Sequence, residues 1–196
     1  MDGNIVVFRQ GSLGDTIVSI PVFEQIRRSY PRSKIYLLTS FQGNPNIVPT
    51  ERLLINGNLV DTVIKYKNGM RDINDFMYVR SEIKRRKIRL CFYLMPRRKK
   101  REVLRDAIFL KICGLKKVVG LSFSQKKMTS RTYAGGLVEF EGDRLYRSVF
   151  PGLERPTESG TPLFGHKEIL DVSNILRNNK IKKEKMIVVS MVSKMS

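Results

Sequence analysis

The residues with the clearest chemical potential lie in a short loop, residues 9–15, with the sequence Arg-Gln-Gly-Ser-Leu-Gly-Asp. The loop follows a continuous apolar run at residues 4–8, which is typical of a strand buried on both faces. Open α/β sheets bind ligands at the carboxyl ends of their strands. Glycines such as Gly11 and Gly14 allow close backbone approach, and free N–H groups at a helix start favour phosphate or carboxylate.

The loop contains neither the dinucleotide-binding glycine pattern nor the Gly-Lys-Ser/Thr of a P-loop. Its pattern also fits a tight turn in which Asp15 merely begins the helix. From the loop residues alone, a ligand site and a structural turn both stay open.

A second suggestive feature is the charge, because 37 Lys and Arg stand against 18 Asp and Glu, with a net charge of +19. Residues 80–101 contain eleven Lys or Arg and one Glu, including runs at 84–87 and 97–101. Such an excess favours nucleic acid, an anionic membrane leaflet or a phosphorylated substrate. A generally lysine-rich composition explains the total as well, and both runs also fit a solvated helix face.

The elements that would position these residues begin with a βαβ unit. Residues 15–30 show helical spacing, despite Pro21, with Ser12 or Asp15 as cap, and the sequence Ser-Tyr-Pro at 29–31 ends the helix. A second apolar strand follows at residues 34–39. Strand, helix and strand with short joins predict parallel pairing and a right-handed crossover.

The rest of the chain continues this alternation and predicts an α/β fold, a Rossmann-like parallel sheet with helices on both faces. Further strands are expected at 60–66, 88–95, 118–121 and 186–191. Helices are expected within 41–58 and at 71–86, 101–113 (closed by Gly114), 145–149 and 166–178. The segment 151–165 has the composition of a linker. We therefore expect one domain over residues 1–164, and a linker helix with the first strand of an incomplete second domain over residues 165–196.

Several classes of function find no support in the sequence. Cys91 and Cys113 lack zinc or redox spacing and are expected to be buried thiols. The single histidine, His166, is expected to be incidental. No segment reaches the ~18 apolar residues of a membrane span, and no signal peptide is evident. The expected location is the cytoplasm, with peripheral contact at the cytoplasmic face of the inner membrane as an option.

Residues 5–15, Pro21 six residues later, the Tyr-Pro at 30–31 and the strand at 35–38 together resemble the opening of glycosyltransferase family 9. This is the family of ADP-heptose:lipopolysaccharide heptosyltransferases. The resemblance implies a GT-B architecture, in which the N-terminal Rossmann-like half binds the sugar acceptor and the C-terminal half binds the nucleotide-sugar donor. Because two such halves need roughly 150–200 residues each, the chain is expected to be truncated and inactive in transfer by itself.

The resemblance also implies roles for individual residues. Asp15 corresponds to the proposed general base, which takes a proton from the acceptor hydroxyl. No metal and no cofactor are implied; the ADP-linked sugar is a substrate, and a phosphorylated, lipid-linked saccharide is the acceptor. No specific nucleic acid is expected. The residues expected to bind the acceptor are Arg9, Gly11, Ser12, Gly14, Thr16, Arg97 and Arg98.

The main alternative is a non-catalytic, basic Rossmann-like module that binds a polyanion such as nucleic acid or an anionic membrane. This alternative predicts steep salt dependence and no effect of Asp15→Asn on binding.

Overall fold

A single parallel sheet organises the chain in the computed structural model, which describes residues 3–41, 50–67, 73–124, 129–156 and 166–178. The strand order is β3-β2-β1-β4-β5, and every neighbouring pair is parallel. The expected Rossmann-like α/β fold class is confirmed. The strands are β1 (Ile5–Phe8), β2 (Ile35–Phe41), β3 (Thr62–Lys67), β4 (Leu90–Tyr93) and β5 (Lys117–Val119).

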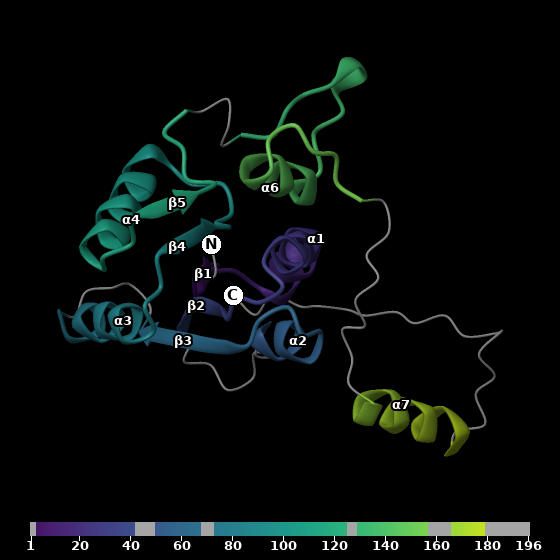
Figure 1. Cartoon of the computed structure of the whole chain (residues 1–196). Helices are drawn as coiled ribbons and strands as arrows, with labels where there is room; N and C mark the ends of the chain where they lie inside the picture. Colours follow the sequence, from purple (N-terminus) through teal and green to yellow (C-terminus); the bar gives the residue numbers. More distant parts are fainter. Residues whose placement is uncertain (1–2, 42–49, 68–72, 125–128, 157–165, 179–196) are drawn as a thin grey trace, which may run out of the picture.

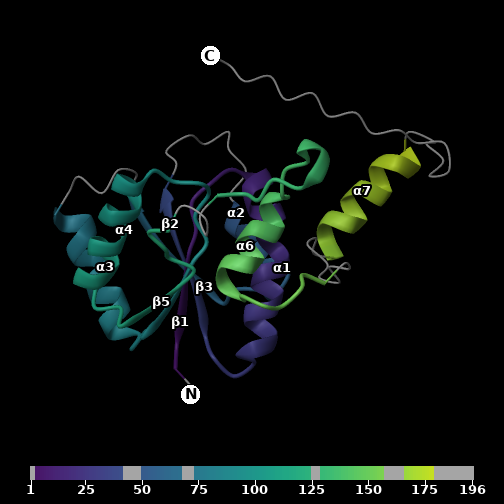
Figure 2. The same ribbon diagram turned by 90° about the horizontal axis from the view of Figure 1, so that it is seen from above.

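Helices cover both faces of this sheet (Figure 1). On one face lie α1 (Leu13–Ser29), α2 (Thr50–Asn56) and α6 (Glu141–Val149), and on the other lie α3 (Ile73–Arg85) and α4 (Lys100–Ile112). Figure 2 shows the same two layers from above. Each layer buries its own hydrophobic cluster against the sheet.

The central strand β1 explains why its sequence is a continuous apolar run. Val6 and Phe8 belong to the cluster under α3 and α4, whereas Ile5 and Val7 belong to the cluster under α1 and α6. All four side chains are at most 1% exposed. Alternate residues of a strand point to opposite faces, so burial on both sides requires every residue to be apolar.

Helix α1 begins two residues earlier than expected, at Leu13, because Ser12 is its N-cap and Asp15 lies in its first turn. It ends at Ser29, as expected, and continues through Pro21. The expected closure of α4 is also confirmed. Gly114 N–H donates to the Lys111 carbonyl (3.0 Å) and Leu115 N–H to that of Leu110 (3.1 Å), which is the Schellman pattern.

The remaining expected elements are confirmed in type with shifted ends where the structure describes them. Part of the loop expected up to residue 136 forms a short 3₁₀ turn, Ala134–Gly136. Helix α7 (His166–Asn178) forms where it was expected. The strand expected at 186–191 and most of the expected linker lie outside the described residues, so the two-domain division stays a prediction. Within the described ranges, every helix is too short or too polar to cross a bilayer.

Candidate active site

The candidate site lies where the chain reverses its direction across the sheet. From β1 the chain moves outward to β2 and β3, and then returns to place β4 on the other side of β1. The loops after β1 and β4 therefore open at the same edge with their helices on opposite faces. This is the switch point at which open α/β sheets bind ligands, and it brings residues 9–15 next to residues 94–99.

The side chain of Arg9 links these two loops by hydrogen bonds to a backbone carbonyl in each. Its side chain is buried, with Nη1 donating to the Leu94 carbonyl at 2.6 Å and Nη2 donating to the Asp15 carbonyl. Burial lowers the Arg9 pKa to about 10, against the opposing influence of the nearby Asp15, so the guanidinium stays charged at neutral pH. Arg9 was expected to bind the acceptor. In the structure its side chain is buried and bonds the backbone carbonyl of Asp15, so it helps to position that residue.

A second buried arginine, from α6, supports the adjacent peptide of the same loop. Arg144 is 1% exposed, and its Nη2 donates to the Met95 carbonyl at 3.0 Å. Its guanidinium also binds both carboxylate oxygens of Glu141, at 2.7 and 2.6 Å. The end of β4 is thus held by two charged side chains from different elements, which favours a rigid edge of the site.

Asp15 has one carboxylate oxygen fixed and one available. Oδ2 accepts hydrogen bonds from the Ser12 backbone N–H (2.7 Å) and the Ser12 hydroxyl (2.8 Å), forming a capping box. In the described part of the chain, Oδ1 makes no hydrogen bond. Thr16 is buried and donates to the Ser12 carbonyl at 3.1 Å, so it supports the turn from within. This geometry suits a proton acceptor as well as a helix cap.

The two glycines of the loop differ in what they permit. Gly11 has φ +148°, and a Cβ there would lie 2.8 Å from the Asp15 Cβ and 2.9 Å from its Oδ2. At Gly14 the nearest such atom is the Ser12 hydroxyl oxygen, 3.9 Å away. Gly11 therefore makes room for the Asp15 carboxylate, and Gly14 is not required for that purpose.

We predict that Gly11→Ala destabilises the fold by about 1–3 kcal/mol, because the added methyl group strains the backbone and pushes against Asp15. Gly152→Ala is the matched control, since Gly152 also has a positive φ, +89°, but open space around it. Urea unfolding of the three proteins measures the difference. Equal losses in both variants would show that the contact with Asp15 has no energetic consequence.

A chain of polar side chains extends from the loop across the α3 and α4 side of the edge. The Gln10 amide donates to the Tyr66 hydroxyl, and Arg98 Nη2 donates to Gln10 Oε1 at 2.5 Å. Arg98 Nε lies 3.8 Å from Asp106 Oδ2, which also accepts from the Tyr93 hydroxyl at 2.8 Å. Burial raises the pKa of both tyrosines, so they remain protonated.

Four of these polar side chains were not among the expected site residues: Gln10, Tyr66, Tyr93 and Asp106. Three of them carried a usable signal, since Gln10, Tyr66 and Tyr93 lie at or just after the carboxyl ends of strands, where site residues gather. Asp106 gave none, because an acidic residue within a helix is ordinarily solvated.

Arg97 and Arg98 differ although they are neighbours. Arg98 is largely buried; it donates a hydrogen bond to Gln10, and its charge is compensated by Glu102 (3.7 Å) and Asp106 (3.8 Å). Arg97 is exposed, without an ion pair among the described residues. A hollow of about 510 Å³ opens at the start of α4, and its lining comprises Arg97, Arg98, Lys99, Lys100 and Glu102. Arg97 and the two lysines are therefore the cations available to an anion there.

The hollow does not include Asp15, and Arg98 is the residue that connects it to the Gly11 loop through Gln10. In the ranges that the structure covers, no three His, Cys, Asp or Glu side chains gather as a metal site would need. Cys91 and Cys113 are buried thiols, and burial raises the pKa of both.

No protein-family model matches the sequence, and no curated protein matches it. Among solved structures, the chain is similar to the glycosyl transferase family 9 protein from Veillonella parvula, with 17% identity and a TM-score of 0.61. The similarity covers 93% of this chain and 51% of that structure, so the chain spans about half of its length. At this identity the likeness concerns the fold, and it agrees with the expected N-terminal half of a GT-B fold.

Proposed function

We propose that this chain forms the acceptor-binding half of a glycosyltransferase that acts on a phosphorylated saccharide. The observation that carries the proposal is the Asp15 carboxylate at the switch-point edge of the sheet: Ser12 holds one of its oxygens, and no other described residue bonds the second. The similarity in fold to about half of a family 9 glycosyltransferase supports it. In its finer form, the sugar is a heptose or a related sugar from an ADP-linked donor, and the acceptor is a lipopolysaccharide core.

In the proposed reaction the acceptor hydroxyl oxygen attacks the anomeric carbon of the donor sugar. Its bond to that carbon forms while the bond from the carbon to the nucleotide diphosphate breaks, and the diphosphate leaves with the electron pair. The hydroxyl proton passes to Asp15 Oδ1. The two hydrogen bonds from Ser12 hold Oδ2 and so aim the carboxylate, which is the positioning that general-base catalysis requires.

The cations at the start of α4 supply the means of binding the acceptor's phosphate groups. Arg97, Lys99 and Lys100 are exposed and line the hollow. An exposed arginine can bind phosphate through two parallel hydrogen bonds. Arg98 is already compensated, so in this proposal it positions Gln10 and the loop instead of contacting the phosphate.

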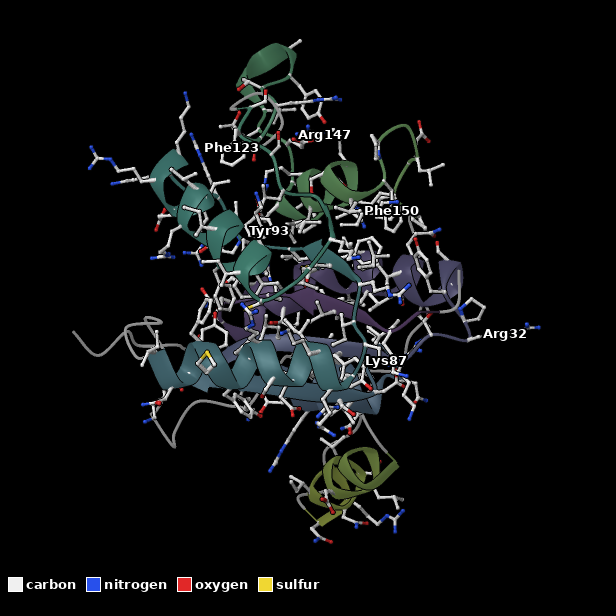
Figure 3. The ribbon with its side chains drawn as sticks, turned by 60° about the vertical axis from the view of Figure 1, so that its left-hand side comes forward. Arg32, Lys87, Tyr93, Phe123, Arg147 and Phe150 are labelled. Atoms are coloured by element: carbon white, nitrogen blue, oxygen red, sulfur yellow. The ribbon has the colours of Figure 1, made fainter. Side chains whose placement is uncertain are left out.

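Binding of a phosphorylated core oligosaccharide to the 196-residue chain tests this proposal by titration calorimetry. We expect saturable binding that weakens about tenfold when the saccharide is dephosphorylated or when Arg97 is changed to Gln, because a charge-assisted contact is lost. Arg32→Gln is the matched control, since it removes the same charge from an exposed position between α1 and β2, away from the site (Figure 3).

The contrary result would be equal binding of phosphorylated saccharide and heparin, with steep salt dependence and equal losses for Arg97→Gln and Arg32→Gln. That outcome would favour the non-catalytic polyanion-binding module instead, because nonspecific binding depends on total charge.

A further inference from the structure

Three large apolar side chains of α4 are exposed among its basic residues, at positions where a helix on the surface of a globular protein is normally polar. Leu104, Ile108 and Ile112 are 52%, 51% and 44% exposed. They recur every four residues and therefore form one line along the helix. The opposite side of α4 packs against the sheet, where its apolar residues Val103, Phe109 and Leu110 are buried in the core.

The acidic and basic residues of α4 also lie on different sides of the helix. Its two acidic residues point away from the apolar line: Asp106 is buried and bonded to Tyr93, and Glu102 accepts from the Lys99 N–H at 2.8 Å. Arg101 and Lys111 are exposed. Each lies three residues from a member of the line, Leu104 and Ile108 respectively, so both cations are its neighbours on the helix surface.

Helix α3 extends this surface. It lies beside α4 on the same face of the sheet (Figures 1 and 3), with Arg80 Nη1 donating to the Ile112 carbonyl at 2.9 Å. The rings of Phe76 and Phe109 pack between the helices, with their centroids 5.8 Å apart. On α3, Ile73 is 73% exposed and Met77 is 56% exposed. We call Ile73, Met77, Leu104, Ile108 and Ile112 the α3–α4 surface.

We propose that the α3–α4 surface docks on an anionic lipid bilayer. An apolar line flanked by basic residues is the pattern of a helix that lies in the membrane interface, where apolar side chains enter the acyl boundary and cations meet acidic headgroups. The net charge of +19 strengthens the attraction. A nucleic acid would leave the apolar side chains unused, and a second copy of the chain would place like charges face to face.

This proposal goes beyond the proposed function and does not depend on it. Helix α4 begins at the basic hollow, at the carboxyl edge of the sheet. Docking through α4 therefore brings the hollow close to the lipid surface.

Co-sedimentation of the 196-residue chain with vesicles tests the proposal. We expect binding to phosphatidylcholine vesicles that contain phosphatidylglycerol, and much weaker binding to phosphatidylcholine alone. Leu104→Gln/Ile108→Gln leaves the net charge unchanged and is expected to weaken binding at least about tenfold, because two apolar side chains no longer enter the bilayer. Arg101→Gln/Lys111→Gln is expected to weaken binding to the vesicles that contain phosphatidylglycerol and to leave binding to pure phosphatidylcholine vesicles unchanged.

Leu137→Gln/Val138→Gln is the matched control, because these residues are 70% and 67% exposed but lie in the loop before α6. It should bind vesicles as the unchanged protein does, and all variants should keep their unfolding midpoints. Full binding by the Leu104→Gln/Ile108→Gln variant would overturn the proposal, as would an equal loss in the control. The proposal would also fail if the unchanged protein were a dimer in solution and only the Leu104→Gln/Ile108→Gln variant were a monomer. None of these outcomes bears on saccharide binding, which is measured without lipid.

Discussion

Replacing Asp15 with asparagine is expected to lower sugar transfer by about 10²–10⁴-fold in a protein that carries both halves of the fold, because the acceptor hydroxyl loses its proton acceptor. The acceptor should still bind, since Asp15→Asn leaves Arg97 and the basic hollow untouched. Product formation from a nucleotide-sugar donor and titration of the acceptor measure the two effects separately.

The same variant should fold almost normally. The asparagine side-chain oxygen can accept the hydrogen bond that Ser12 N–H now gives to Asp15 Oδ2, and a weakened cap costs about 0.5–1 kcal/mol. Asp75→Asn is the matched control, because Asp75 also lies in the first turn of a helix, α3, far along the chain from the loop. Normal transfer by Asp15→Asn, or an equal loss in the control, would exclude the general-base role.

The largest effect on stability is expected for Phe8→Ala, which should lower the free energy of unfolding by about 3–5 kcal/mol. Phe8 is fully buried at the end of β1. Three aromatic rings surround it, and their centroids lie 6.3 Å (Tyr66), 6.0 Å (Tyr93) and 5.9 Å (Phe109) from the centroid of the Phe8 ring. Removing the ring leaves a cavity between the sheet and the layer of α3 and α4. The midpoint of urea unfolding measures the loss.

Phe123→Ala is the control for this change, because Phe123 is 53% exposed and should contribute within about 0.5 kcal/mol. Phe8→Leu keeps most of the volume and should cost clearly less than Phe8→Ala, so a graded series remains measurable if the alanine variant does not fold. Similar midpoints for Phe8→Ala and the unchanged protein would contradict the central place of Phe8 in this core.

The candidate site could be located from the sequence but not assembled from it. The apolar run before the glycine loop predicted a strand buried on both faces, and Ser12 or Asp15 was expected to cap the helix that follows. The structure confirmed both, because strand burial and helix capping depend on residues within a few positions of each other. The same holds for Gly114, where the cap involves only residues 110–115.

The sequence did not distinguish the two arginines after β4. Arg98 is bound to Gln10, 88 residues away in the chain, and Arg97 is exposed, although both follow the same strand. Likewise, the sequence did not predict that the side chain of Arg9, a residue expected to bind the acceptor, is buried and bonds the Leu94 carbonyl, 85 residues away. Which side chain is buried depends on the strand order and on the packing of α4 and α6, and neither leaves a local pattern in the chain.

The sequence by itself thus determined the alternation of strands and helices, the parallel sheet and the position of the Gly11–Asp15 turn, because these follow from periodicity, apolar runs and capping residues close together in the chain. Only the tertiary structure decided that β4 lies beside β1, that Asp15 Oδ1 has no hydrogen bond to any described residue, and that the line of Leu104, Ile108 and Ile112 faces outward. The physical reason is that each of these facts depends on contacts between segments far apart in sequence. Such contacts form where burial of apolar surface and satisfaction of buried polar groups agree for the whole chain at once.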